Sequence, residues 1–87
     1  MKEPTPMRVS LYSKDECHLC EAAREIILRV QKNHPFSFEE IHLTESSPLF
    51  TKYETLFPVI LLNGKEISHW RISEEQLTDA LMLAVEI

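Results

Sequence analysis

The sequence predicts a single α/β domain in three layers, in which a small mixed sheet is covered by helices on both faces. Three observations predict it. Patterns typical of strands and of helices alternate, a tight Asn63-Gly64 turn joins the last two strand patterns, and 87 residues suffice for only one core. The expected order is strand, helix, strand, helix, strand, strand, helix. This order implies parallel strands first and an antiparallel hairpin at the edge.

The first half of the chain contains a strand, a helix and a second strand. Residues 7–12 alternate apolar and polar side chains, which predicts a strand. After a polar loop, residues 18–33 repeat apolar side chains at helical spacing, so a helix of about four turns is expected. On its outer face Glu25 precedes Arg29 by one turn, an order that favours an ion pair within the helix. Residues 36–43 predict the second strand, with a break in its alternation that leaves the facing of its side chains open.

The second half adds a short helix, a hairpin and a last helix. Ser47-Pro48 combines a capping residue with a proline in the first turn, which predicts a helix of about two turns. Residues 56–62 form a continuous apolar run, typical of a central strand covered on both faces. The strand from residue 65 to residue 69 or 70 completes the hairpin. Ser73 begins a capping box, and the apolar residues after it predict a helix that packs on the sheet.

Composition and charge exclude several classes of function. The formal net charge is −5 and lysine and arginine are not clustered, which disfavours binding to nucleic acid or to an anionic membrane. The apolar runs are too short for a membrane span, and the first residues lack the apolar stretch of a signal peptide. We expect a cytoplasmic monomer, with residues 1–6 as an extended lead-in and residues 7–87 as the domain.

The only two cysteines, Cys17 and Cys20, lie where the first strand pattern gives way to the first helix pattern. The unpaired N–H groups and the dipole at a helix start favour the thiolate of Cys17. Cys17 is therefore the candidate nucleophile, and Cys20, one turn further on, is the candidate resolving thiol. In a reducing compartment, such a pair is typical of a redox couple or of part of a metal site.

Other interpretations of the cysteines stay open at this point. The pair is a redox couple, half of a zinc, copper or iron–sulfur site, or two idle thiols. His34, His42 and His69 show no metal-ligand spacing, which favours the redox couple, and a metal or cluster shared by two chains stays an alternative. We expect no bound metal or organic cofactor. His18, next to Cys17, either stabilises the thiolate in its charged form or is simply solvated.

Several short segments stand in the same order as in a known family. They are Leu11-Tyr12-Ser13, Cys17-His18-Leu19-Cys20-Glu21-Ala22, Pro58-Val59-Ile60, Asn63-Gly64-Lys65 and Trp70-Arg71. With them, nearly the whole chain resembles the thioredoxin fold in its minimal glutaredoxin form, and most closely a family of small glutaredoxin-like proteins. The resemblance implies a thiol-disulfide oxidoreductase that uses a Cys17–Cys20 couple on protein or low-molecular-weight disulfides. Glutathione or a thioredoxin-type reductase would regenerate the dithiol.

The resemblance also implies which residues position the substrate. Pro58 is expected to be a cis proline that faces the two cysteines, and the backbone of Phe57 is expected to pair with an extended substrate. Lys14 stands three residues before Cys17, where glutaredoxins use a lysine to bind a carboxylate of glutathione.

One segment departs from the glutaredoxin pattern. Glutaredoxins follow the last strand with a glycine pair and an acidic residue that bind the other end of glutathione, whereas this chain has Ser68-His69-Trp70-Arg71. Side chains in place of glycines disfavour glutathione binding of the usual kind. Arg71 is still a candidate to bind a carboxylate, and Trp70 either lines a peptide groove or packs beside the last helix. The alternatives to an enzyme are a metal-binding carrier and a non-catalytic interaction module.

Overall fold

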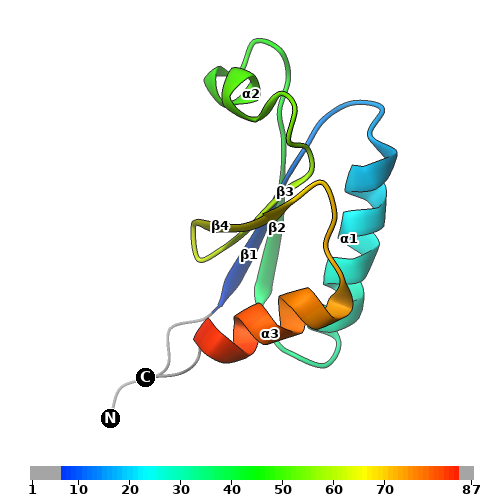
Figure 1. Ribbon diagram of the computed structural model, residues 1–87, viewed down its shortest axis with the longest axis vertical. Coiled ribbons are helices and arrows are strands. Elements are labelled where there is room, and N and C mark those ends of the chain that lie inside the picture. The colour runs from blue at the N-terminus through cyan, green and yellow to red at the C-terminus, as the bar shows by residue number, and fades with distance from the viewer. Residues whose placement is uncertain (1–6, 85–87) are drawn as a thin grey trace.

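The computed structural model describes residues 7–84 and confirms the expected order of strands and helices (Figure 1). The elements are β1 (Arg8–Ser13), α1 (His18–Gln31), β2 (Ser37–His42), α2 (Pro48–Tyr53), β3 (Val59–Leu62), β4 (Lys65–His69) and α3 (Glu74–Ala84). The expected lead-in at residues 1–6, and the last helix beyond Ala84, lie outside the described residues.

The four strands form one mixed sheet in the order β2-β1-β3-β4. β1 and β2 are parallel, because α1 carries the chain back across the sheet between them, and β3 is antiparallel to both β1 and β4. In Figure 1, α1 runs beside the sheet, α3 crosses one end and the short α2 lies at the other end. The predicted mixed sheet with an antiparallel hairpin at its edge is therefore confirmed.

Each face of the sheet carries its own group of buried apolar side chains. The first group lies between the sheet and the helices α1 and α3, and it consists of Val9, Leu11, Ala23, Ile27, Val30, Phe36, Ile60, Leu62, Ile72, Leu77 and Leu81. The second group consists of Leu43, Tyr53, Phe57, Val59 and Leu61 together with Cys20 from the start of α1. All residues of β3 are buried and alternate between the two groups, as the apolar run predicted for a strand covered on both faces.

The strand at this run is shorter than expected, since β3 begins only at Val59. The peptide bond between Phe57 and Pro58 is cis, as the resemblance implied. The backbone N–H of Trp70 donates to the carbonyl oxygens of Pro58 at 2.9 Å and of Leu56 at 3.3 Å. The first part of the apolar run is therefore held by the loop after β4 and is not part of the strand.

The ion pairs of α1 also differ from expectation. Arg29 does not pair with Glu25 within the helix, because its guanidinium donates to Glu74 at the start of α3, with an N–O distance of 2.9 Å. Arg24 donates to Glu40 of β2 through two nitrogens, at 2.6 and 2.7 Å. α1 is thus tied to α3 near its C-terminal end, through Arg29, and to the edge strand β2 near its middle, through Arg24. It ends at Gln31, two residues earlier than expected.

The predicted helix caps are present. The hydroxyl oxygen of Ser47 accepts a hydrogen bond from the backbone N–H of Leu49 at 3.3 Å, with Pro48 in the first turn of α2. The hydroxyl oxygen of Ser73 accepts one from the backbone N–H of Gln76 at 3.0 Å, at the start of α3, but within residues 7–84 the Gln76 side chain makes no return bond to Ser73, so only half of the predicted capping box is formed. Within residues 7–84, none of the helices combines the length and the apolar character that a membrane crossing requires.

Candidate functional site

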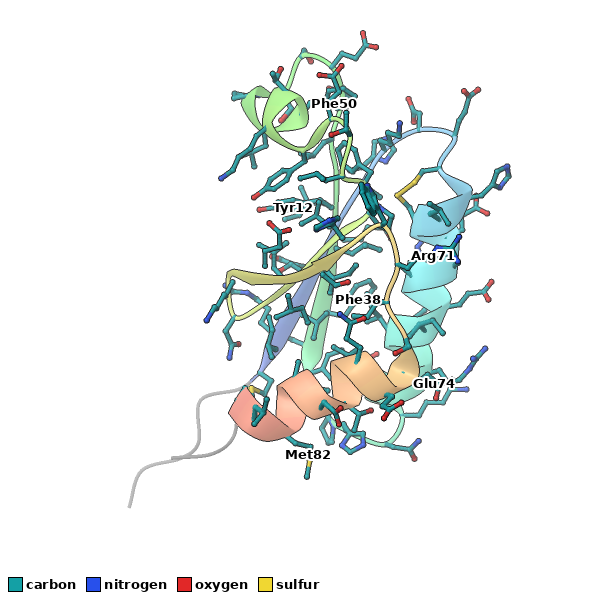
Figure 2. The ribbon with its side chains drawn as sticks, in the orientation of Figure 1. Tyr12, Phe38, Phe50, Arg71, Glu74 and Met82 are labelled. Carbon is teal, nitrogen blue, oxygen red and sulfur yellow. A yellow bond between two sulfur atoms is a disulfide. The ribbon has the colours of Figure 1, made fainter. Side chains whose placement is uncertain are left out.

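Cys17 and Cys20 form a disulfide at the start of α1, seen as the yellow bond in Figure 2. Their Cα atoms are 5.2 Å apart, a distance typical of disulfides. Cys17 is the N-cap residue of α1, and its Sγ accepts a hydrogen bond from the backbone N–H of Cys20 at 3.1 Å. After reduction, the same N–H and the dipole of α1 favour negative charge on the Cys17 sulfur.

The two cysteines differ in access to solvent. Cys20 is only 1% exposed and packs among apolar side chains that include Leu43, Tyr53 and Phe57. Cys17 is half-buried at the edge of the same group. A partner can therefore reach the sulfur of Cys17 more readily than that of Cys20. This difference fits a nucleophile and a resolving thiol in the order that the sequence predicted.

Phe57 and Pro58 are both buried, and the Phe57 ring belongs to the same apolar group as Cys20. Phe57 lies outside the helices and strands, and within residues 7–84 neither its N–H nor its carbonyl makes a backbone hydrogen bond. A backbone segment with free donors and acceptors is able to pair with an extended peptide. The geometry is compatible with the predicted roles of these two residues, which stay predictions.

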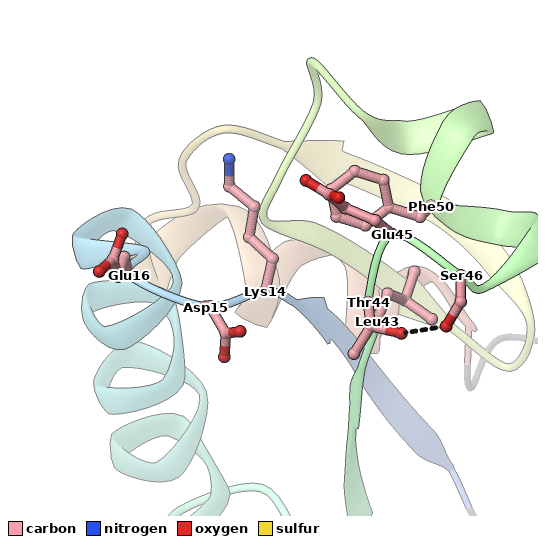
Figure 3. A pocket seen from close by; sticks show the side chains of 8 residues that line it. All are labelled: Lys14, Asp15, Glu16, Leu43, Thr44, Glu45, Ser46 and Phe50. Carbon is pink, nitrogen blue, oxygen red and sulfur yellow. Dashed lines mark hydrogen bonds between the residues drawn. The ribbon is translucent and has the colours of Figure 1, made fainter.

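Lys14 lines a cleft beside the loop that precedes Cys17 (Figure 3). Its Nζ is 5.8 Å from the centre of the Phe57 ring. The cleft has a volume of about 560 Å³ and is lined by Lys14, Asp15, Glu16, Leu43, Thr44, Glu45, Ser46 and Phe50. Its lining thus contains one cation and three carboxylates. This excess of negative charge opposes the binding of an anion such as glutathione. It also weakens the attraction of Lys14 for a carboxylate.

The other two predicted site residues are separate from this cleft. The side chain of His18 is 98% exposed, and its Nδ1 lies 3.8 Å from a carboxylate oxygen of Glu21. This is the environment of a solvated histidine at a helix start. Arg71 lies on the segment between β4 and α3 that runs beside α1 (Figure 2) and lines a different groove. The structure therefore brings Lys14 and Phe57 together and places Arg71 apart from them.

One polar network near the cysteines was not predicted. The hydroxyl of Ser13, a residue that is 1% exposed, donates to the Glu40 carboxylate at 2.7 Å. Arg24 binds both oxygens of this carboxylate, and its hydrogen bonds, together with that of Ser13, hold the pKa of Glu40 below its usual range. A second contact joins the ring of His42 to Asp15 at 2.8 Å. The first contact joins the end of β1 to β2, and the second joins the loop before Cys17 to the end of β2.

The sequence held one signal for this network, the break in alternation of the second strand. Phe38 and Glu40 lie on the face of β2 that α1 covers, whereas Ile41 points to the other core group. Glu40 thus occupies a position next to α1, where Arg24 partners it. Within the described residues there is no group of three or more His, Cys, Asp or Glu side chains placed to hold a metal ion.

Comparison with known proteins places this geometry in context. Residues 8–82 match the family described as glutaredoxin-like domain (DUF836). Similar solved structures include a structural genomics target protein from X. campestris, at 25% identity over 86% of this chain and 96% of that chain, with a TM-score of 0.73. A protein from Nitrosomonas europaea shares 23% identity over 92% and 96% of the two chains, with a TM-score of 0.75. A thioredoxin-like protein from Bacillus cereus shares 24% over 91% and 88%, with a TM-score of 0.68. These likenesses show the thioredoxin-like fold.

Proposed function

Since the chain belongs to the glutaredoxin-like domain family, we propose that it is a thiol-disulfide oxidoreductase that cycles Cys17 and Cys20 between dithiol and disulfide. The observation that carries the proposal is that the two sulfurs differ in access to solvent and in hydrogen bonding. Cys17 is the accessible N-cap residue whose Sγ accepts the Cys20 N–H, and Cys20 is buried one turn behind it. A structural disulfide has no need of one activated and one shielded sulfur.

The reaction proceeds by two thiol-disulfide exchanges. The Cys17 thiolate attacks one sulfur of the substrate disulfide, forms a mixed disulfide with it and releases the other sulfur as a thiolate. Cys20 then loses its proton and attacks the Cys17 sulfur, which closes the Cys17–Cys20 disulfide and releases the second substrate thiolate. The substrate gains two electrons and the cysteine pair loses two. An external thiol reductant returns the pair to the dithiol by the reverse steps.

The surrounding residues bind and orient the substrate. The free N–H and carbonyl of Phe57 pair with the backbone of an extended partner, and Pro58 shapes the surface next to the disulfide. Lys14 attracts a carboxylate at the edge of the cleft, against the three acidic residues around it. His18, when protonated, adds positive charge close to the Cys17 thiolate.

The partners follow from this chemistry. The substrate is a protein disulfide or a small disulfide, and the reductant is glutathione or a thioredoxin-type reductase. The acidic cleft and the missing glycine pair favour the protein reductant. We propose that the chain acts as a cytoplasmic monomer without a resident metal or organic cofactor.

Trapping of the mixed disulfide tests the proposal. The Cys20→Ser variant, incubated with a protein disulfide substrate, is expected to accumulate a covalent adduct on Cys17 and to lose turnover, because nothing resolves the adduct. The matched variant Cys17→Ser should form no adduct. If Cys20→Ser traps nothing and Cys17 titrates near about 8.5, the value of an unperturbed thiol, the enzyme proposal fails. Equal binding of a partner by the wild type and by a double Cys→Ser variant would instead indicate a non-catalytic interaction module.

A further inference from the structure

A second groove shares no lining residue with the Lys14 cleft and includes Leu19 of the cysteine motif. Its walls come from α1, with Leu19 and Ile26, and from the segment between β4 and α3, with Trp70, Arg71 and Ile72. Leu19 lies between the two cysteines in the sequence, and Arg71 lies beside α1 (Figure 2), so the groove begins at the helix turn that carries the disulfide. Its volume is about 250 Å³. Sites for small-molecule ligands usually measure about 300–1,000 Å³, so this groove suits one or two side chains of a larger partner.

Trp70 is held in an unusual conformation at the edge of this groove. Its φ of 69° lies in the left-handed region that bulky residues rarely adopt. Two sets of hydrogen bonds keep it there: its backbone N–H binds the Pro58 carbonyl, and its ring Nε1–H donates to the Thr55 carbonyl at 2.7 Å. Even so, the residue is 52% exposed. Strain of this kind is found where a position serves function, and a fixed, exposed aromatic ring is typical of binding sites.

The charge of the groove comes from Arg71. Its side chain is exposed and forms no ion pair within residues 7–84, whereas Arg24 and Arg29 are each bound to a carboxylate. The other walls are apolar. A groove with apolar walls and one available guanidinium complements an apolar side chain that lies next to a carboxylate.

We propose that this groove docks the protein substrate of the oxidoreductase. An extended segment whose cysteine reacts with Cys17 places an apolar side chain against Leu19 and Trp70, and a neighbouring aspartate or glutamate against Arg71. The inference rests on the proposed function and specifies its substrate class, a protein disulfide flanked by an apolar and an acidic residue. Exposed Leu19, at 43%, is then covered only when the partner is bound.

Synthetic peptides that each carry one cysteine, blocked as a mixed disulfide with thionitrobenzoate, test this proposal. In three probes the two residues before the cysteine are Phe-Asp, Phe-Lys or Ser-Asp. The reduced protein attacks the mixed disulfide, and the release of coloured thionitrobenzoate gives the rate constant. We expect the Phe-Asp probe to react on the order of fivefold faster than either of the others. Bis(hydroxyethyl) disulfide serves as a small uncharged substrate.

Matched variants assign the preference to the groove. Arg71→Glu is expected to invert the ratio of the Phe-Asp and Phe-Lys rate constants. Arg8→Glu changes the net charge equally at the opposite end of β1 from the cysteines and should leave that ratio unchanged. Trp70→Asn, chosen because asparagine tolerates a positive φ, should remove the advantage of phenylalanine over serine. Leu19→Ala gives the same readout on α1 should the Trp70 variant not fold.

The outcomes separate this proposal from the proposed function. A wild-type protein that reduces bis(hydroxyethyl) disulfide but reacts equally with all three peptides overturns the docking proposal and leaves the oxidoreductase intact. The docking proposal is also overturned if glutathione disulfide reacts faster than every peptide and Arg71→Glu removes that advantage, because the groove then binds glutathione. A wild-type protein that reacts with no disulfide overturns the proposed function, and the docking proposal with it.

Discussion

The network around Glu40 gives a prediction whose size follows from the structure. Glu40→Ala is expected to lower the free energy of unfolding by about 1–4 kcal/mol. The lost ion pair with Arg24 contributes up to about 1 kcal/mol, because both side chains are partly exposed. The larger contribution to this loss comes from Ser13. Its nearly inaccessible hydroxyl loses the only acceptor that it has within residues 7–84, which costs about 1–3 kcal/mol.

A double-mutant cycle tests this explanation. Ser13→Ala alone should cost about 1 kcal/mol, and the double variant should cost at least about 1 kcal/mol less than the sum of the two, because no hydroxyl is then left without an acceptor. Urea denaturation of the fully reduced proteins, followed by circular dichroism, measures all four free energies. Glu25→Ala, an acidic residue exposed on α1, is the control and should change stability by less than about 0.5 kcal/mol. Strict additivity, or a Glu40→Ala variant as stable as the wild type, would refute the reasoning.

Three further predictions concern stability. Because Arg24 and Ser13 lower the folded-state pKa of Glu40, its contribution is present above the unfolded pKa and is lost as the pH falls through the folded one. The stability difference between wild type and Glu40→Gln should therefore be largest above about pH 5 and shrink in more acidic urea titrations, and a flat difference would contradict it. Ile27→Ala, at a fully buried position, should cost about 2–5 kcal/mol, whereas the truncation Leu28→Ala at a 41% exposed position should cost far less in the same denaturation assay. Ser73→Ala should cost about 1 kcal/mol with a loss of helical signal, and an unchanged midpoint would show that the cap of α3 contributes nothing.

The features that the sequence predicted well are those encoded within a few neighbouring residues. Alternation, helical spacing and the Asn63-Gly64 turn fixed the order of elements, since each depends on local backbone preference. The prediction that Cys17 lies at a helix start also rested on neighbouring residues, and in the structure Cys17 is the N-cap of α1. The cis bond at Pro58 came from the family resemblance, because a proline alone only permits it.

The features that were missed depend on partners far along the chain. Arg29 pairs with Glu74 because the packing of α1 on α3 brings them together, and no spacing within α1 reports that. Likewise, the left-handed backbone of Trp70 is set by carbonyls of the segment before β3. Periodicity indicates which side of a helix or strand faces the core, but it does not indicate which polar group from a distant part of the chain lies next to it.

The position of β3 in the sheet bears on the order in which the reactive site is assembled. The β1–α1–β2 unit is contiguous in sequence, whereas β3 pairs Leu62 with Val9 across most of the domain. Closing so long a loop is entropically costly, and pairings of this kind form slowly. Both cysteines belong to the β1–α1–β2 unit. Tyr53 and Phe57, which bury Cys20, follow this unit in the sequence. Until that long-range pairing forms, Cys20 lacks the neighbours that shield it, so the difference in access between the two sulfurs depends on the whole domain and not on α1 alone.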